Sequence, residues 1–122
     1  MLQATVARID DDDVPRLRDW LAALAARREE LEESYRTHGT RHELFLLVRT
    51  PPRPLLVVIA EVDDDQAAVE SFLRSELPID VEFKSLVQDM SPTFAEVELL
   101  YDSSTLVGDS ASVEVAPRPR TP

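Results

Sequence analysis

One pattern, a strand that ends in a run of aspartates and is followed by an amphipathic helix, occurs twice in this chain of 122 residues. The first copy centres on Asp10–Asp13 and the second on Asp63–Asp65. Aspartates in front of a helix favour its positive N-terminal end, and one of them can cap it. A further strand follows each helix. The pattern therefore predicts an α+β fold of the ferredoxin-like β-α-β-β-α-β type, a four-stranded antiparallel sheet with its helices on one face.

The longest patterned segment is Val14–His38, which predicts a single helix of about seven turns. Its apolar stripe repeats at steps of three and four residues and consists of Val14, Leu17, Leu21, Leu24, Leu31 and Tyr35. Pro15 suits the first helical turn, and Gly39 can take the left-handed conformation that ends a helix. Arg28 interrupts the stripe with a charge, which must be paired, extended to solvent or presented to a ligand.

The other elements follow from alternation, proline positions and apolar spacing. The predicted strands are Leu2–Ile9, Arg41–Thr50, Leu55–Val62 and Phe94–Tyr101. The prolines between the second and third strands predict a tight antiparallel hairpin. A second helix presents Ala68, Val69, Phe72 and Leu73. A third helix, for which Asp80 is the expected N-cap, presents Phe83, Leu86, Val87 and Met90.

The composition changes near residue 103, so the chain divides into an α+β domain over residues 1–102 and a flexible C-terminal tail over residues 103–122. A domain of this length can hold a single core. The tail is rich in serine, threonine, proline and small residues, a composition typical of extended or disordered chain ends. Within it, Ser112–Ala116 has the pattern of a short added strand.

The second and third strands are apolar on both faces over residues 44–48 and 55–60. An antiparallel sheet with one solvated face should alternate instead, and the helices can cover one face only. Large apolar patches are rare on monomers, so the predicted cover is a second copy of the chain packed face to face as a homodimer. The alternative cover is the C-terminal tail folded over the sheet.

The composition limits the kinds of partner and the cellular environment that the chain suits. A net charge of −11 disfavours nucleic acid and anionic membranes as partners. No apolar run reaches the ~20 residues that span a bilayer, and the N-terminus lacks the layout of a secretory signal, so a cytoplasmic protein is expected. One lysine, Lys84, stands against twelve arginines in an acidic chain. This balance suits either a protein adapted to high salt or a genome rich in G and C.

Several short segments resemble a known structural group. They are Arg16–Leu21 (RLRDWL), Arg28, Glu43 and Leu77–Asp80 (LPID). Together with the element order, they resemble the dimeric α+β barrel proteins, which include antibiotic-biosynthesis-type monooxygenases and rhamnose-mutarotase-like proteins. Over about residues 2–102 the chain looks most like an uncharacterised bacterial and archaeal family, a domain of unknown function. The resemblance implies a dimeric barrel and brings no assigned reaction with it.

Four residues are candidates for binding a ligand: Arg28, Tyr35, Glu43 and Asp80. The guanidinium of Arg28 could grip a carboxylate, and the alternative is a salt bridge to Glu43, Asp80 or Glu32. His42 and Glu43 are the candidates for acid–base catalysis, because a buried carboxylate can have a raised pKa. The two side chains point to opposite faces of their strand.

No metal site or cofactor is predicted. His38 lies at a helix C-terminus, where a protonated imidazole is favoured, and Gly39 separates it from His42, so the two do not form a helical metal pair. The run Asp10–Asp13 lacks the glycine and the glutamate of a calcium-binding EF-hand loop. The chain contains two glycines, too few for a glycine-rich phosphate loop.

Two functions are compatible with these features. The first is a dimeric protein that binds a small molecule and has no recognisable catalytic motif. The second is a small cofactor-independent enzyme, monooxygenase- or isomerase-like, that acts on a small organic substrate by acid–base chemistry. A structural oligomer without a pocket is a third hypothesis. The enzyme hypothesis loses its main support if Arg28 and Glu43 only pair with each other under packed side chains instead of lining a solvent-connected cavity.

Overall fold

A computed structural model describes residues 1–103 and 113–115 of the chain. The strands in this part are β1 (Leu2–Arg8), β2 (Thr40–Val48), β3 (Leu55–Val62), β4 (Thr93–Phe94) and β5 (Val113–Val115). The α-helices are α1 (Val14–Ala23), α2 (Arg28–His38), α3 (Asp65–Arg74) and α4 (Pro78–Met90). Two short 3-10 segments flank α1, namely η1 (Asp11–Asp13) and η2 (Leu24–Arg27). None of these helices is long and apolar enough to pass through a lipid bilayer.

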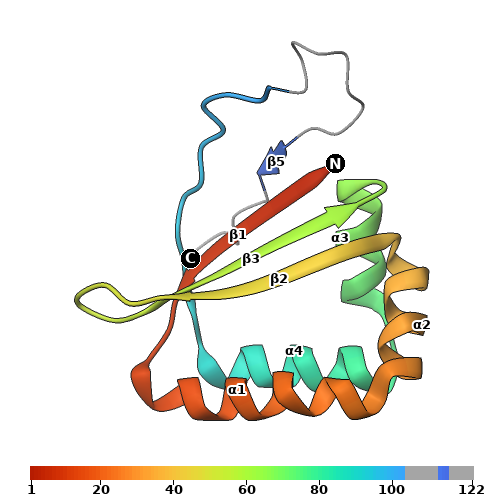
Figure 1. Cartoon of the computed structure of the whole chain (residues 1–122), viewed down its shortest axis with the longest axis horizontal. Helices are drawn as coiled ribbons and strands as arrows, with labels where there is room; N and C mark the ends of the chain where they lie inside the picture. Colours follow the sequence, from red (N-terminus) through yellow and green to blue (C-terminus); the bar gives the residue numbers. More distant parts are fainter. Residues whose placement is uncertain (104–112, 116–122) are drawn as a thin grey trace.

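The sheet has the strand order β2-β3-β1-β4, and neighbouring strands in that order are antiparallel. This order confirms the predicted α+β class with a four-stranded antiparallel sheet, and it is compatible with a ferredoxin-like arrangement. β5 falls within the predicted strand Ser112–Ala116 and pairs in parallel with Leu2–Ala4 of β1. β1 therefore lies between β3 on one side and the short strands β4 and β5 on the other (Figure 1).

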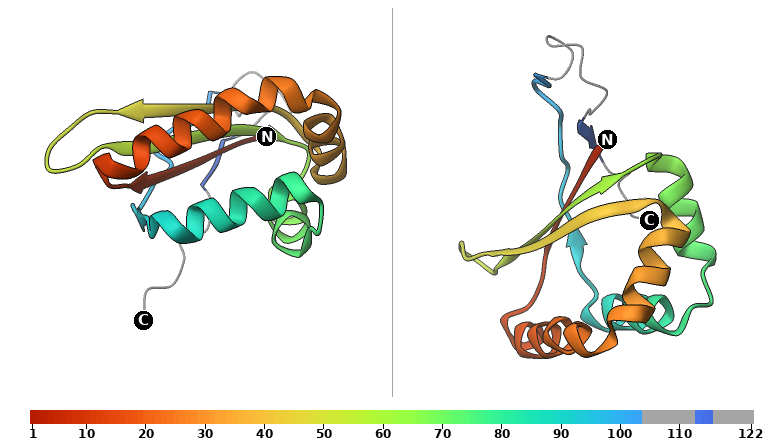
Figure 2. Two further views of the ribbon diagram at one scale, coloured as in Figure 1. Left: turned by 90° about the horizontal axis from the view of Figure 1, so that it is seen from below. Right: turned by 45° about the vertical axis from the view of Figure 1, so that its right-hand side comes forward.

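The helices lie on one side of the sheet (Figures 1 and 2). α1 and α4 run alongside each other beneath it, while α2 and α3 stand at the end where β2 begins and β3 ends. The buried core between α1, α4 and the sheet contains Ile9, Val14, Leu17, Leu56, Leu86 and Met90. Burying each large apolar side chain of this kind stabilises a fold by about 1.5–3 kcal/mol.

The prediction of a single helix over residues 14–38 is wrong, because η2 joins two separate helices there. Arg27 leaves the helical conformation, with φ −122° and ψ 40°, and its guanidinium binds Glu30 and Glu82 at 2.7–2.9 Å. A straight helix over these residues would span about 37 Å, which exceeds the roughly 30 Å of the nine-residue strand β2. The bend therefore returns the chain to the start of β2. No glycine or proline causes the bend; the contact of Arg27 with Glu82 on α4 stabilises it.

The predicted strand Phe94–Tyr101 is also corrected, because only Thr93–Phe94 pairs with β1. The N–H of Ala95 still donates to the carbonyl of Val6 at 2.8 Å, and the chain then leaves the sheet edge. β5 takes the place at that edge beside residues 2–4. The alternating pattern that suggested a long strand thus belongs to an extended segment, in which Leu100 is 86% exposed.

The two aspartate runs differ at their helices. Asp64 caps α3 by accepting a hydrogen bond from the N–H of Ala67 at 2.8 Å. The cap expected from the first run, Asp10–Asp13, is wrong, because this run forms η1 and makes no side-chain cap to α1. The expected N-cap role of Asp80 is wrong: α4 begins at Pro78, a residue suited to the first helical turn, and Leu77 is its N-cap. Asp80 instead lies buried in that first turn.

The sheet face turned away from the helices carries apolar side chains that stay exposed in the described structure. Leu44, Leu46 and Val48 on β2 are 42–43% exposed, and the strands are apolar on both faces, as predicted. The strand register places side chains of β3 and β1 beside them. We call this surface the open face; it consists of Ala4, Val6, Leu44, Leu46, Val48, Leu55, Val57 and Ile59.

Candidate functional site

A cavity of about 600 Å³ lies between the helices and the sheet. This volume falls within the range of roughly 300–1,000 Å³ that is typical of small-molecule sites. β1, β2 and β3 form one side of it, and all four α-helices contribute to the other side. Apolar residues make up most of the lining, among them Leu31, Phe45, Leu56, Val58, Phe72, Phe83 and Val87.

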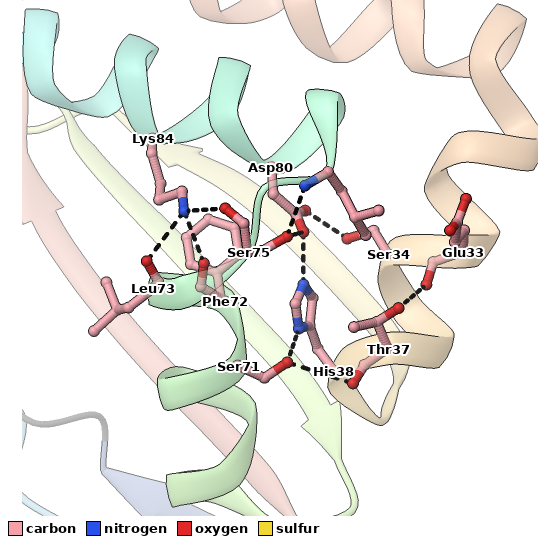
Figure 3. Close-up of polar contacts among 11 residues, drawn as sticks. Glu33, Ser34, Thr37, His38, Ser71, Phe72, Leu73, Ser75, Asp80 and Lys84 are labelled. Carbon is pink, nitrogen blue, oxygen red and sulfur yellow. Dashed lines mark hydrogen bonds and ion pairs between the residues drawn. The ribbon is translucent and has the colours of Figure 1, made fainter.

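His38 and Asp80 form the centre of a buried polar cluster in the cavity wall, where α2, α3 and α4 meet (Figure 3). His38 Nε2 lies 2.7 Å from Asp80 Oδ2, and His38 Nδ1 lies 2.5 Å from Ser71 Oγ. The hydroxyls of Ser34 and Ser75 donate to Asp80 Oδ1 and Oδ2, each at 2.6 Å. We call these five residues the His38–Asp80 cluster. It ties the C-terminal turns of α2 and α3 to the first turn of α4.

The charge of Asp80 is well supported by its surroundings. Burial alone would raise the pKa of this carboxyl, but the hydrogen bonds from Ser34, Ser75 and His38 outweigh burial, so the net pKa is lowered. A carboxylate in the first turn of α4 and a histidine in the last turn of α2 also suit the dipoles of their helices. Both Asp80 oxygens and both His38 ring nitrogens therefore have protein partners.

Tyr35 and Glu43 form a second polar pair in the cavity wall. The hydroxyl of Tyr35 donates to Glu43 Oε1 at 3.0 Å. The pKa of Glu43 is raised, mainly because the carboxyl is removed from water. The hydrogen bond from Tyr35 lowers the pKa, and the negative charge of Asp80 raises it further. The pKa of Tyr35 is raised as well, by burial first and then by the charge of Glu43. Within the described residues, no other side chain donates a hydrogen bond to Glu43.

Lys84 lines the cavity, but its ammonium is directed at the end of α3 (Figure 3). Lys84 Nζ donates to the backbone carbonyls of Phe72, Leu73 and Ser75 at 3.0, 3.2 and 2.8 Å. Carbonyls at the end of a helix have no intrahelical donor, so the lysine supplies the missing hydrogen bonds. An ammonium has three protons, and all three are used here.

Four aromatic side chains form one connected group along the cavity, and we call it the aromatic wall. Phe83 is its centre: the ring centroids of Trp20, Phe45 and Phe72 lie 5.2, 5.7 and 6.1 Å from that of Phe83. Phe45 follows Glu43 by two residues on β2, so both side chains face the helices. The side chain of Glu43 and the four aromatic side chains therefore line the same cavity.

The structure brings three of the four predicted ligand-binding residues, Tyr35, Glu43 and Asp80, to the cavity. Arg28 lies outside it, with a side chain that is 84% exposed and paired with Glu32 at 2.9 Å, one of the predicted ion-pair alternatives. His42 is exposed on the side of β2 opposite Glu43. The two proposed acid–base candidates therefore do not share a site.

The sequence alone did not identify the His38–Asp80 cluster or the role of Lys84. One local signal was available, since Ser34 and His38 are four residues apart and therefore share a face of α2. Their partner Asp80 is distant in sequence, and no spacing links it to them. Among the described residues there is no group of three or more histidines, aspartates or glutamates arranged to hold a metal ion.

Comparison with known proteins places the chain in a family without giving it an activity. The model of a family of unknown function, DUF6176, matches residues 2–107, so the chain belongs to that family. No curated protein and no solved structure matches the chain. Function must therefore be inferred from the cavity and its side chains.

Proposed function

We propose that this member of a family of unknown function binds a small, mainly apolar organic molecule in the cavity between helices and sheet. The observation that carries the proposal is an apolar cavity of about 600 Å³ with polar side chains gathered in one part of its wall. Such a site gains affinity from apolar burial and takes orientation from a few polar groups. Tyr35 and Glu43 are the polar groups in the best position to orient the ligand.

A cavity-filling variant tests this proposal. Indole and toluene, added to the wild-type protein, should raise its melting temperature, because a ligand bound to the native state stabilises it. Val58→Phe places extra volume in the cavity lining and should abolish the shift. The matched control Val81→Phe, at a residue of α4 that is 47% exposed, should retain it. The proposal is wrong if neither probe raises the melting temperature of the wild type.

A second candidate function, an isomerase-like enzyme, is favoured by the raised pKa of Glu43. A carboxylate with a raised pKa is a stronger base, and Tyr35 could donate a hydrogen bond to a carbonyl oxygen while Glu43 takes a proton from the adjacent carbon, provided that the single hydroxyl proton of Tyr35 turns from Glu43 to the substrate. Phenylacetone incubated in D2O should then incorporate deuterium beside its carbonyl, as followed by NMR. Glu43→Gln should lose the activity. A rate equal to the buffer background would exclude this candidate for the probe used.

We further propose that the open face is covered by a second copy of the chain. Its apolar side chains lie side by side on β1, β2 and β3, and Leu44, Leu46 and Val48 are 42–43% exposed. Contiguous exposed apolar surface of this kind often marks a protein–protein contact. A twofold dimer of two such faces would match apolar side chains against themselves. This is the face-to-face contact that a dimeric α+β barrel requires.

The oligomeric state tests the dimer directly. Wild-type protein should sediment as a dimer at micromolar concentration. Leu46→Glu should convert it to a monomer, because the substitution would bury a charge in the contact. Leu73→Glu, at a side chain of α3 that is 65% exposed, is the matched control and should leave the dimer intact. A monomeric wild-type protein would overturn this part of the proposal.

A further inference from the structure

The charged groups around the cavity indicate what kind of ligand it selects. Among the described residues that line it, the ionisable side chains are Tyr35, His38, Glu43, Asp80 and Lys84. The part of the lining that the structure describes contains no arginine, although twelve of the thirteen basic residues in the chain are arginines. A ligand anion would therefore depend on His38 or Lys84 for its positive partner.

Neither of these two side chains is available to an anion. The three protons of Lys84 go to backbone carbonyls at the end of α3. The ring nitrogens of His38 are engaged by Asp80 and Ser71. A ligand carboxylate or phosphate would have to break one of these contacts, and it would meet the charges of Glu43 and Asp80 without a counterion.

The acidic groups differ in what they can still accept. Asp80 already receives hydrogen bonds at both oxygens, from Ser34 on Oδ1 and from Ser75 and His38 on Oδ2. Glu43 receives one, from Tyr35 on Oε1, and its Oε2 has no donor among the described residues. Glu43 is thus the ionisable group in the lining with a free strong acceptor, and it calls for a ligand that carries a hydrogen-bond donor.

The aromatic wall favours a positively charged donor over a neutral one. The faces of aromatic rings attract cations, and the attraction grows when water is excluded. Phe45 lies on the same face of β2 as Glu43 and contacts Phe83 within the wall. A ligand ammonium beside Glu43 would supply an ion-pair partner to a partly buried carboxylate that forms no ion pair among the described residues, which a hydroxyl cannot do.

From these contacts we propose that the cavity selects an organic amine, whose ammonium donates to Glu43 and whose apolar part lies along the aromatic wall. This inference rests on the proposed small-molecule binding function and specifies its ligand class. Binding should weaken as the pH falls, because the ammonium needs an ionised Glu43 and the pKa of Glu43 is raised in the free protein. Tyr35 and His38 on α2 and Asp80 and Lys84 on α4 are the other titratable groups bordering the cavity. In this proposal these four residues keep the hydrogen bonds that they make within the protein.

Three probes of similar size test the selectivity: phenethylamine, phenethyl alcohol and phenylacetate. Calorimetry on the full-length protein at neutral pH should show phenethylamine binding about tenfold more tightly than the alcohol, the difference expected for a charge-assisted hydrogen bond. Phenylacetate should bind most weakly. Glu43→Gln should remove the preference for the amine. Glu61→Gln is the matched control and should preserve the preference, because Glu61 lies on β3 and faces the side of the sheet opposite to Glu43.

The outcomes separate the ligand class from the binding function. If the alcohol or phenylacetate binds as tightly as the amine, the amine inference is wrong, while the binding function stands. If no probe binds, and indole and toluene do not bind either, both proposals fail. A pH series with wild-type protein gives a check that needs no variant: amine affinity should fall between neutral pH and pH 5 while alcohol affinity changes less. Equal pH dependence of the two probes would also overturn the inference.

Discussion

Two acidic side chains line the same cavity in opposite states of hydrogen bonding. Asp80 accepts hydrogen bonds from Ser34, Ser75 and His38, whereas Glu43 accepts one, from Tyr35. Burial raises the pKa of each carboxyl, yet the net pKa is lowered for Asp80 and raised for Glu43. Among the described residues Asp80 has three hydrogen-bond donors and Glu43 has one, and these donors outweigh the effect of burial at Asp80 but not at Glu43.

The difference assigns the two acids to different tasks. A buried carboxylate with all its acceptors satisfied holds the surrounding helices together, because removing it leaves several donors unpaired. A partly buried carboxylate with one oxygen that has no protein donor among the described residues can gain a partner when a ligand binds. Asp80 is thus expected to govern folding, and Glu43 is expected to govern recognition.

The largest expected effect comes from removing the charge of Asp80. Asp80→Asn should lower the free energy of unfolding by about 3–5 kcal/mol, because it removes a buried charge that accepts hydrogen bonds from three side chains. Urea unfolding monitored by circular dichroism measures it. The control is Asp89→Asn, whose carboxyl is 53% exposed beside Arg16 and should contribute less than about 1 kcal/mol. Equal losses in the two variants would contradict a supporting role for the cluster.

The same pair of proteins should differ in acid. The pKa of Asp80 is lower in the folded than in the unfolded chain, so its stabilising contribution is present above the unfolded pKa and is lost as the pH falls through the folded pKa. Wild-type protein should therefore lose this part of its stability in acid, and Asp80→Asn should lack that part of the loss. Urea unfolding curves in a pH series show whether the stabilities of the two proteins converge as the pH falls. A constant gap between the variants down to low pH would contradict the lowered pKa.

An intermediate effect is expected at Lys84, the other fully engaged charge in the cavity wall. Lys84→Met keeps the aliphatic stem and removes three hydrogen bonds to the end of α3, so the free energy of unfolding should fall by about 2 kcal/mol. Arg74→Met is the matched control, since Arg74 is an exposed basic residue in the last turn of the same helix. Chemical denaturation of both variants gives the comparison, and a neutral Lys84→Met would show that water replaces the ammonium without cost.

Glu43 should respond in the opposite direction. Glu43→Gln removes a buried charge but keeps an acceptor for Tyr35, so the free energy of unfolding at neutral pH should rise, by on the order of 1 kcal/mol. Because the folded-state pKa of Glu43 is raised, the penalty for its ionisation grows as the pH rises through that pKa and disappears in acid. The gain should therefore be present at neutral pH and vanish near pH 4. A loss of stability at neutral pH would contradict the contrast between the two acids.

The sequence predicted the parts of this molecule that local pattern controls. The order of the strands and the two apolar faces of β2 follow from alternation and spacing. The break at Arg27 and the short β4 do not, because contacts with α4 and competition from β5 decide them.

The candidate site was predictable to a similar extent. Tyr35, Glu43 and Asp80 reach the cavity because each lies on an inward-facing position of its element. The partners of Asp80 come from α2 and from the turn after α3, and no spacing in one sequence reveals such a meeting. Arg28 is a candidate from the sequence because it interrupts an apolar stripe, but the break at η2 places its side chain in solvent.

The smallest expected effect belongs to Tyr35, the single protein partner of Glu43. Tyr35→Phe removes one hydrogen bond and should lower the free energy of unfolding by about 0.5–1 kcal/mol at neutral pH. Without this donor the pKa of Glu43 should rise further, so the loss should shrink in acid, where Glu43 is protonated in both proteins. A double-mutant cycle with Glu43→Gln, measured by urea unfolding, isolates the coupling. The coupling free energy from the cycle could instead equal the full loss of stability caused by Asp80→Asn. Tyr35 would then satisfy Glu43 fully, and the carboxyl would not be free to accept a hydrogen bond from a ligand.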